Sequence, residues 1–161
     1  MNSTIRRAGV VIASTRAASG QYQDLTGPVI VDWLVEHGFE IHAPVVVPDG
    51  GAVGAALRGL LLTKPSVIIT SGGTGLSPDD QTPEQTLPLI DRQIPGIMEA
   101  LRAAGRENTP MAMLSRGYAG MAGNCFVVNL PGSPHAVMDG LSLLDPVLAH
   151  LCEQVDGSHE H

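Results

Sequence analysis

The sequence predicts a single α/β domain with three layers, α/β/α, built around a mostly parallel sheet. Two observations lead to this fold class. The chain has 161 residues, which is the length of one domain. Short apolar runs rich in β-branched residues alternate along it with helical patterns, as in successive βαβ units. Because 43% of the residues are hydrophobic and only 3% are aromatic, we expect an aliphatic core.

The first half of the chain has three candidate strands and two candidate helices. We expect strands at 8–14, within 39–47 and at 66–70, because these stretches are short and apolar. Thr26 as N-cap and Pro28 in the first turn predict a helix that ends at Gly38. Residues 52–62 have a repeated apolar face and should form the second helix.

The second half is less regular. Helices are expected from Pro83 and at 95–104, and strands at 111–115 and 125–130. Ser133 and Asp145 are each followed by proline, a pattern that predicts a helix start at each position. Ligands of such sheets bind beyond the carboxyl ends of the strands. The residues that directly follow the strands are therefore the candidates for a site.

Charge excludes several classes of function. Nine basic and sixteen acidic residues give a net charge of −7. No basic stripe exists to contact a row of phosphates, so nucleic acid is not an expected partner. The single lysine, Lys64, precedes Pro65, which rules out a Walker A loop.

The remaining composition predicts a cytoplasmic protein. Two cysteines, Cys125 and Cys152, form no disulfide framework and are interpreted as reduced thiols. No apolar run approaches the ~20 residues of a membrane helix, so no membrane partner is expected. The first residues lack the apolar stretch of a signal peptide. We expect one domain over 1–161, with flexible ends at 1–6 and 156–161.

A glycine loop (residues 71–75) follows the third strand. Three glycines within four residues allow positive φ angles and let a ligand approach the main chain closely, where successive N–H groups bind anions. Thr82 is expected to cap the next helix in a capping box with Gln85. The predicted substrate-binding residues here are Ser71, Gly72, Gly73, Thr74, Gly75 and Thr82. A tight structural turn is the alternative interpretation of the glycines.

Carboxylates accompany this loop. Asp79 and Asp80 would repel a phosphate unless a cation lay between them, and Mg²⁺ is typically held by one or two carboxylates together with substrate phosphates. Asp49 follows the second strand and could face the same loop, or simply cap the next helix. We therefore expect a Mg²⁺ site and a polyphosphate ligand.

Three further segments follow strands and offer hydroxyls or a cation. Arg116 is a candidate clamp for phosphate, with a surface salt bridge as the alternative. Ser133 should cap a helix whose first N–H groups could also receive an anion. The candidates in these segments are Ser14, Thr15, Ser115, Arg116, Pro131, Gly132 and Ser133.

Several of these motifs, in this order, resemble one known family. Residues 71–75 with 80–84 are similar to the signature of the MogA/MoaB family of molybdenum-cofactor proteins, which includes the G domains of gephyrin and the plant Cnx proteins. The similarity continues through Pro48-Asp49 and through 94–96, 113–116 and 129–134, so it spans about residues 8–151. It implies a MogA/MoaB-like, Rossmann-like architecture.

The resemblance also implies an activity. Members of the Mog type adenylylate molybdopterin with Mg-ATP and release pyrophosphate. The two family aspartates regarded as essential match Asp49 and Asp80, which would be catalytic and would hold Mg²⁺ directly or through water. ATP would be the co-substrate and molybdopterin the substrate. Family members form homotrimers, and some form hexamers. The alternative interpretation is a MoaB-like protein that binds molybdopterin without turnover.

Overall fold

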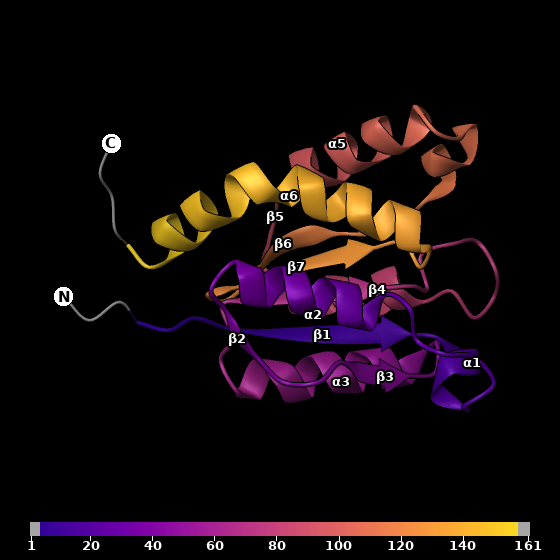
Figure 1. The fold of residues 1–161 in the computed structure, drawn as a ribbon, viewed down its shortest axis with the longest axis horizontal. Helices are drawn as coiled ribbons and strands as arrows, with labels where there is room; N and C mark the ends of the chain where they lie inside the picture. The colour runs from indigo at the N-terminus through magenta and orange to yellow at the C-terminus, as the bar shows by residue number, and fades with distance from the viewer. Residues whose placement is uncertain (1–3, 158–161) are drawn as a thin grey trace.

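A computed structural model describes residues 4–157 of the chain, so the outermost parts of the tails expected to be flexible, 1–3 and 158–161, lie outside the described residues. The described residues form a seven-stranded mixed sheet in the order β2-β1-β4-β7-β6-β5, with β3 also paired to β1 (Figure 1). The strands are β1 (Arg7–Ala13), β2 (Glu40–Ile41), β3 (Val45–Val47), β4 (Val67–Ser71), β5 (Arg92–Gln93), β6 (Ala119–Ala122) and β7 (Cys125–Leu130).

The central pairs β1–β4 and β4–β7 are parallel, whereas β6 runs antiparallel to both β7 and β5. The expectation of a mostly parallel sheet is confirmed. The strand expected within 39–47 is two short strands that pair with different parts of β1. Pro44 lies between them and has no N–H for a continuous ladder.

Helices cover both faces of the sheet, which confirms three layers (Figure 1). One face packs against α2 (Gly27–Glu36), α5 (Pro95–Arg106) and α6 (Pro134–Val155), and the other against α3 (Gly51–Leu62). The short elements are α1 (Thr15–Ala18), α4 (Thr82–Thr86) and the 3-10 helices η1 (Leu87–Leu89) and η2 (Pro110–Leu114). Alternate residues of one strand serve the two faces, so Val10 and Val11 belong to different cores.

The strand expected at 111–115 is wrong, because these residues form η2. The Thr109 hydroxyl accepts from the N–H of Met111, and Pro110 occupies the first turn. Met111 and Met113 are more than half exposed, so the run is apolar without being buried in the sheet. The next strand along the chain is instead β6, which lies between β7 and β5 and forms a hairpin with β7 through Gly123 at φ +59°.

One further expectation is wrong, and one is confirmed in position but not in its hydrogen bond. Asp145-Pro146 does not start a helix, because α6 continues through Pro146. An interior proline costs about 3 kcal/mol, but Leu144 and Leu148 on either side of it are buried against the sheet and offset this cost. Thr26 is the N-cap of α2 as expected, but its side chain accepts no capping hydrogen bond. Asp24 Oδ1 accepts from the N–H groups of Thr26 and Gly27 at 3.1 and 3.0 Å instead.

His37 joins α2 to α6. Its ring stacks on Trp33 with 4.0 Å between centroids, its Nδ1 contacts the Trp33 carbonyl, and its Nε2 contacts Asp145. Burial lowers the pKa of His37, but the hydrogen bonds to Asp145 and Trp33 outweigh burial and raise this pKa above 6.5. The protonated ring therefore stabilises the folded state.

This contact predicts a pH dependence of stability. Because the folded pKa of His37 exceeds the unfolded one, its contribution is complete below about pH 6.5 and is lost as pH rises through the folded pKa. Urea unfolding between about pH 6 and about pH 8, below the range in which the buried thiols affect stability, should show a decline in the free energy of unfolding that Asp145→Asn removes. The same decline in the variant would contradict this role for His37.

Candidate functional site

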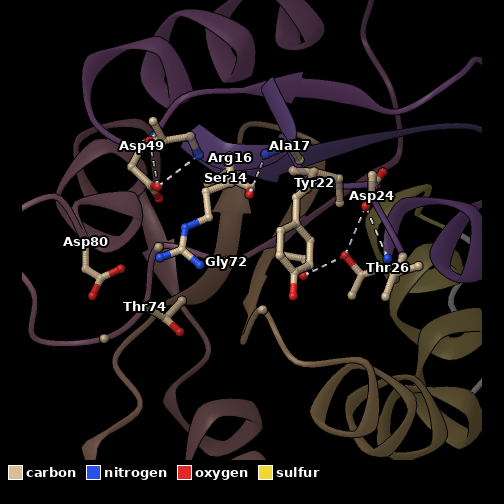
Figure 2. A pocket seen from close by; sticks show the side chains of 18 of the residues that line it. Ser14, Arg16, Ala17, Tyr22, Asp24, Thr26, Asp49, Gly72, Thr74 and Asp80 are labelled. Atoms are coloured by element: carbon tan, nitrogen blue, oxygen red, sulfur yellow. Dashed lines mark hydrogen bonds between the residues drawn. The ribbon is translucent and has the colours of Figure 1, made fainter. Parts of the chain in front are cut away.

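The loops after β1, β3, β4 and β7 meet at one edge of the sheet, where they surround an open cavity of about 670 Å³. This is the edge at which parallel strands end, as the topology rule requires. Most of the predicted site residues line this cavity, and Figure 2 shows it from close by. They are Ser14, Thr15, Asp49, Ser71, Gly72, Gly73, Thr74, Gly75, Asp80 and Gly132.

The glycine loop crosses the floor of this cavity. Gly72 and Gly73 have φ angles of +94° and +70°, and a Cβ atom on Gly72 would lie 2.3 Å from the carbonyl oxygen of Ala13. Within the described residues the N–H groups of Gly73, Thr74 and Gly75 donate no hydrogen bond. Three successive unpaired amides next to a cavity are suited to an anion.

Asp49 is held beside this loop. Its Oδ2 accepts from the N–H and the hydroxyl of Thr15 at 3.3 and 3.1 Å. Its Oδ1 lies 3.1 Å from the position of a Cβ on Gly73. The N-cap of α3 is Gly50, so Asp49 does not have the capping role that was the alternative interpretation. One carboxylate oxygen therefore fixes the side chain and the other faces the loop.

Asp80 lies at the other end of the loop. Its Oδ2 accepts from the N–H of Ser77 at 3.0 Å and lies 2.6 Å from the position of a Cβ on Gly75. Gly73 and Gly75 are two positions apart, at most roughly 7 Å along the chain. The two acids thus flank one short stretch of unpaired amides.

The donor set fits a hard cation shared with phosphate. No group of three His, Cys, Asp or Glu side chains in residues 4–157 could hold a metal ion alone. Asp49 and Asp80 supply only oxygen, which is the ligand Mg²⁺ prefers, and Mg²⁺ commonly completes its shell with phosphate and water. The residues present therefore fit a cation that arrives with a polyphosphate.

Thr82 lies beneath the loop rather than in the cavity lining. The N-cap of α4 is Gln81, so the capping box expected at Thr82 does not form. The buried Thr82 hydroxyl has no hydrogen-bond partner within the described residues, and it lies 2.2 Å from the position of a Cβ on Gly73. This contact requires glycine at position 73.

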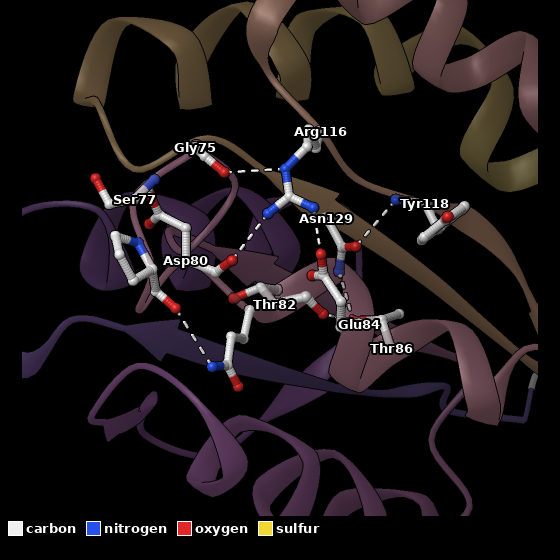
Figure 3. A network of polar contacts seen from close by, with 11 residues as sticks. Gly75, Ser77, Asp80, Thr82, Glu84, Thr86, Arg116, Tyr118 and Asn129 are labelled. Atoms are coloured by element: carbon white, nitrogen blue, oxygen red, sulfur yellow. Dashed lines mark hydrogen bonds and ion pairs between the residues drawn. The ribbon is translucent and has the colours of Figure 1, made fainter.

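Arg116 holds the loop from outside the lining of the main cavity, through the contacts drawn in Figure 3. Its guanidinium donates to the carbonyls of Gly75 and Asp80 at 2.9 and 2.8 Å and pairs with Glu84. The hydrogen bond from Arg116 holds the pKa of Glu84 below its usual range. These contacts correspond to the salt-bridge interpretation of Arg116 and extend it to the loop backbone.

Arg116→Gln is expected to lower the free energy of unfolding by about 2 kcal/mol, because two carbonyls and a carboxylate lose a charged donor. Urea denaturation measures this loss. Arg92→Gln is the matched control. Arg92 is largely exposed, and its ion pair with Asp91, at 3.8 Å, contributes little to stability. Equal stability of the two variants would contradict the role given to Arg116.

The remaining predicted residues, Pro131, Ser115 and Ser133, lie outside the lining of the main cavity. The buried Ser71 hydroxyl donates to the carbonyl of Pro131 at 2.9 Å, so this contact joins β4 to the segment after β7. Ser133 caps α6 as expected, accepting from the N–H of Ala136. Ser115 and Ser133 border a separate, smaller cavity.

One wall of the cavity is formed by residues 16–26, of which sequence reasoning noted only Arg16 for the site, as part of the segment Ser14-Thr15-Arg16 after the first strand. Arg16, Tyr22 and Asp24 line it, with Tyr22 60% exposed (Figure 2). This stretch has no apolar periodicity. Its available signals were a tyrosine in a chain with few aromatic residues and an aspartate two positions before Thr26, in the pattern of an Asx turn.

Known proteins are similar to this chain in sequence and in fold. A protein-family model described as a probable molybdopterin binding domain matches residues 9–150. The chain is 42% identical over 144 residues to a molybdenum cofactor biosynthesis bifunctional protein of Synechococcus elongatus; this covers 89% of the chain and 45% of that relative. The chain thus spans about half the length of this bifunctional relative.

Relatives of similar length also match. A molybdopterin adenylyltransferase of Helicobacter pylori is 30% identical over 155 residues, covering 94% of the chain and 88% of the relative. The structure of the molybdopterin biosynthesis Mog protein from Mycobacterium ulcerans superposes with a TM-score of 0.91 at 47% identity, covering 96% and 99% of the two chains. The family model covers most of the chain, and this confirms the resemblance. The chain belongs to the MogA/MoaB family of molybdopterin-binding domains.

Proposed function

We propose that this chain is a molybdopterin adenylyltransferase, which uses Mg-ATP to adenylylate molybdopterin and releases pyrophosphate. The observation that carries the proposal is the placement of Asp49 and Asp80 on either side of three unpaired loop amides, at the floor of one cavity. The relatives of similar length carry the corresponding name.

The reaction joins two phosphorylated molecules. An oxygen of the terminal phosphate of molybdopterin forms a bond to the α-phosphorus of ATP, and the bond from this phosphorus to the bridging oxygen of pyrophosphate breaks. The electron pair of that bond leaves with pyrophosphate. Positioning and charge stabilisation are the main tasks of the protein in such a transfer.

The chain's own residues divide these tasks. The N–H groups of Gly73, Thr74 and Gly75 bind a phosphate oxygen and orient it. Asp49 and Asp80, which lie beside Gly73 and Gly75, would hold the cation directly or through water. A bound Mg²⁺ supplies positive charge that neutralises the phosphates. Thr15 fixes the direction of the Asp49 carboxylate.

We also propose a cytoplasmic homotrimer. Burial raises the pKa of the Cys125 thiol to about 12, so this free thiol stays protonated and unreactive, as suits a reducing compartment. No helix within residues 4–157 has the length and apolar character to span a bilayer.

The homotrimer is tested by its mass. Light scattering after gel filtration should give three times the 16.8 kDa of one chain. A monomer would contradict the trimer.

Pyrophosphate release from ATP and molybdopterin tests the activity. The purified chain should release pyrophosphate and form adenylylated molybdopterin with MgCl₂, and should do neither with excess EDTA. Omission of molybdopterin is the control for simple ATP hydrolysis. Binding of molybdopterin without pyrophosphate release would contradict the proposal and favour the alternative of a binding protein.

A further inference from the structure

We propose that the Arg16 guanidinium binds a phosphate group of the ligand in the main cavity, as the charged partner that sequence reasoning sought in Arg116. The inference rests on the proposed function for the identity of the ligand, but not for its test. The chemistry recognised is a phosphate ester, from either a nucleotide or a phosphorylated pterin.

The charges around the cavity single out Arg16. Four aspartates line it, at positions 24, 49, 79 and 80, and Arg16 is the basic residue in the lining. Within the described residues the Arg16 side chain makes no hydrogen bond or ion pair. A guanidinium that stays unpaired beside four carboxylates keeps its donors available, and its planar fork matches a phosphate in a bidentate contact.

The backbone beneath this side chain is fixed. The N–H of Ser14 donates to the carbonyl of Val47 at 2.9 Å, and Thr15 is held by Asp49. The carbonyl of Arg16 accepts from the N–H of Tyr22 and from the hydroxyl of Ser19, both at 3.1 Å. The backbone is therefore held both before and at Arg16, and the residue before it contacts the Asp49 carboxylate.

The Arg16 side chain extends from α1 into the cavity that the glycine loop also lines. In the view of Figure 2 its guanidinium lies between Asp80 and Tyr22, with Thr74 below it. A phosphate bound to the unpaired amides of the loop would therefore lie in the same cavity as the Arg16 guanidinium. Both groups would then be available to contact it.

The surroundings of Arg116 support this assignment by contrast. Its Nε and both terminal nitrogens already contact Gly75, Asp80 and Glu84. Arg116 also lies outside the lining of the main cavity. One arginine thus positions the loop through its carbonyls, and the other lines the cavity.

A binding cycle isolates the contact. Isothermal titration calorimetry would compare AMP with adenosine, in the wild type and in Arg16→Gln. We expect Arg16→Gln to weaken AMP binding roughly tenfold to a hundredfold, the effect of a charge-assisted hydrogen-bond pair, and to leave adenosine binding unchanged. Arg16→Lys should restore part of the loss, since it returns charge without the planar fork. Arg92→Gln is the charge-matched control.

The outcomes separate this inference from the proposed function. The role of Arg16 is overturned if Arg16→Gln weakens the binding of AMP and adenosine equally, or weakens neither, and if the same result is found for molybdopterin and its dephosphorylated form. A phosphate-dependent effect with either pair supports it and identifies which phosphate Arg16 contacts. Failure of the wild type to release pyrophosphate would remove the proposed activity and leave this cycle intact.

Discussion

Asp80→Asn and Asp49→Asn are each expected to reduce adenylyl transfer roughly 10²- to 10³-fold, the range found when a group aimed at developing charge is removed. Each substitution removes a negative charge beside the loop amides while keeping the shape of the side chain. In the Asp49→Asn variant the new amide oxygen would still accept from Thr15, so the fold should persist. Pyrophosphate release under saturating substrates measures the loss.

The control for these variants is Asp32→Asn, which changes an acidic residue on α2 away from the cavity lining. It should retain wild-type turnover. Thermal unfolding of all three variants separates a chemical loss from a folding defect. Full activity in a folded Asp80→Asn or Asp49→Asn protein would remove that residue from the mechanism.

Gly72→Ala is expected to lower the free energy of unfolding by at least about 3 kcal/mol and to abolish ligand binding. The positive φ is one cause. The other is overlap of the new Cβ with the carbonyl oxygen of Ala13, a backbone atom in β1 that has no rotamer by which to move away. Relief of this overlap would displace the glycine loop from β1.

Gly38→Ala is the matched control. Gly38 has a similar φ of +85°, but a Cβ there would meet no atom of residues 4–157 within 4 Å. Its substitution should therefore cost only the roughly 1–2 kcal/mol of left-handed backbone. Chemical denaturation of both variants measures the difference. Equal destabilisation would show that the contact with Ala13 has no energetic weight.

The centre of the fold could be predicted from the sequence because its signals are local. Strands β4 and β7 are apolar on both faces, and this identifies them as interior strands of a parallel sheet. The topology rule then places the loops after them at one edge. For this reason the glycine loop and Asp49 could be expected to meet although they lie far apart in the sequence.

The errors come from features that depend on tertiary packing. The η2 segment is apolar but exposed, so periodicity could not separate it from an edge strand. Pro146 carries a strong helix-start signal that burial of neighbouring leucines outweighs. The sequence also offers no way to decide between Arg16 and Arg116, because only the fold shows which guanidinium is already paired.

The dependence of ATP binding on a divalent cation tests the account most directly. Calorimetric titration of ATP into the wild type should show binding that is at least about tenfold tighter with Mg²⁺ than with EDTA, since one bridging cation adds at least one strong charge contact. The Asp49→Asn, Asp80→Asn double variant should lose this difference. Equal affinity for ATP with and without Mg²⁺ in the wild type would contradict the account.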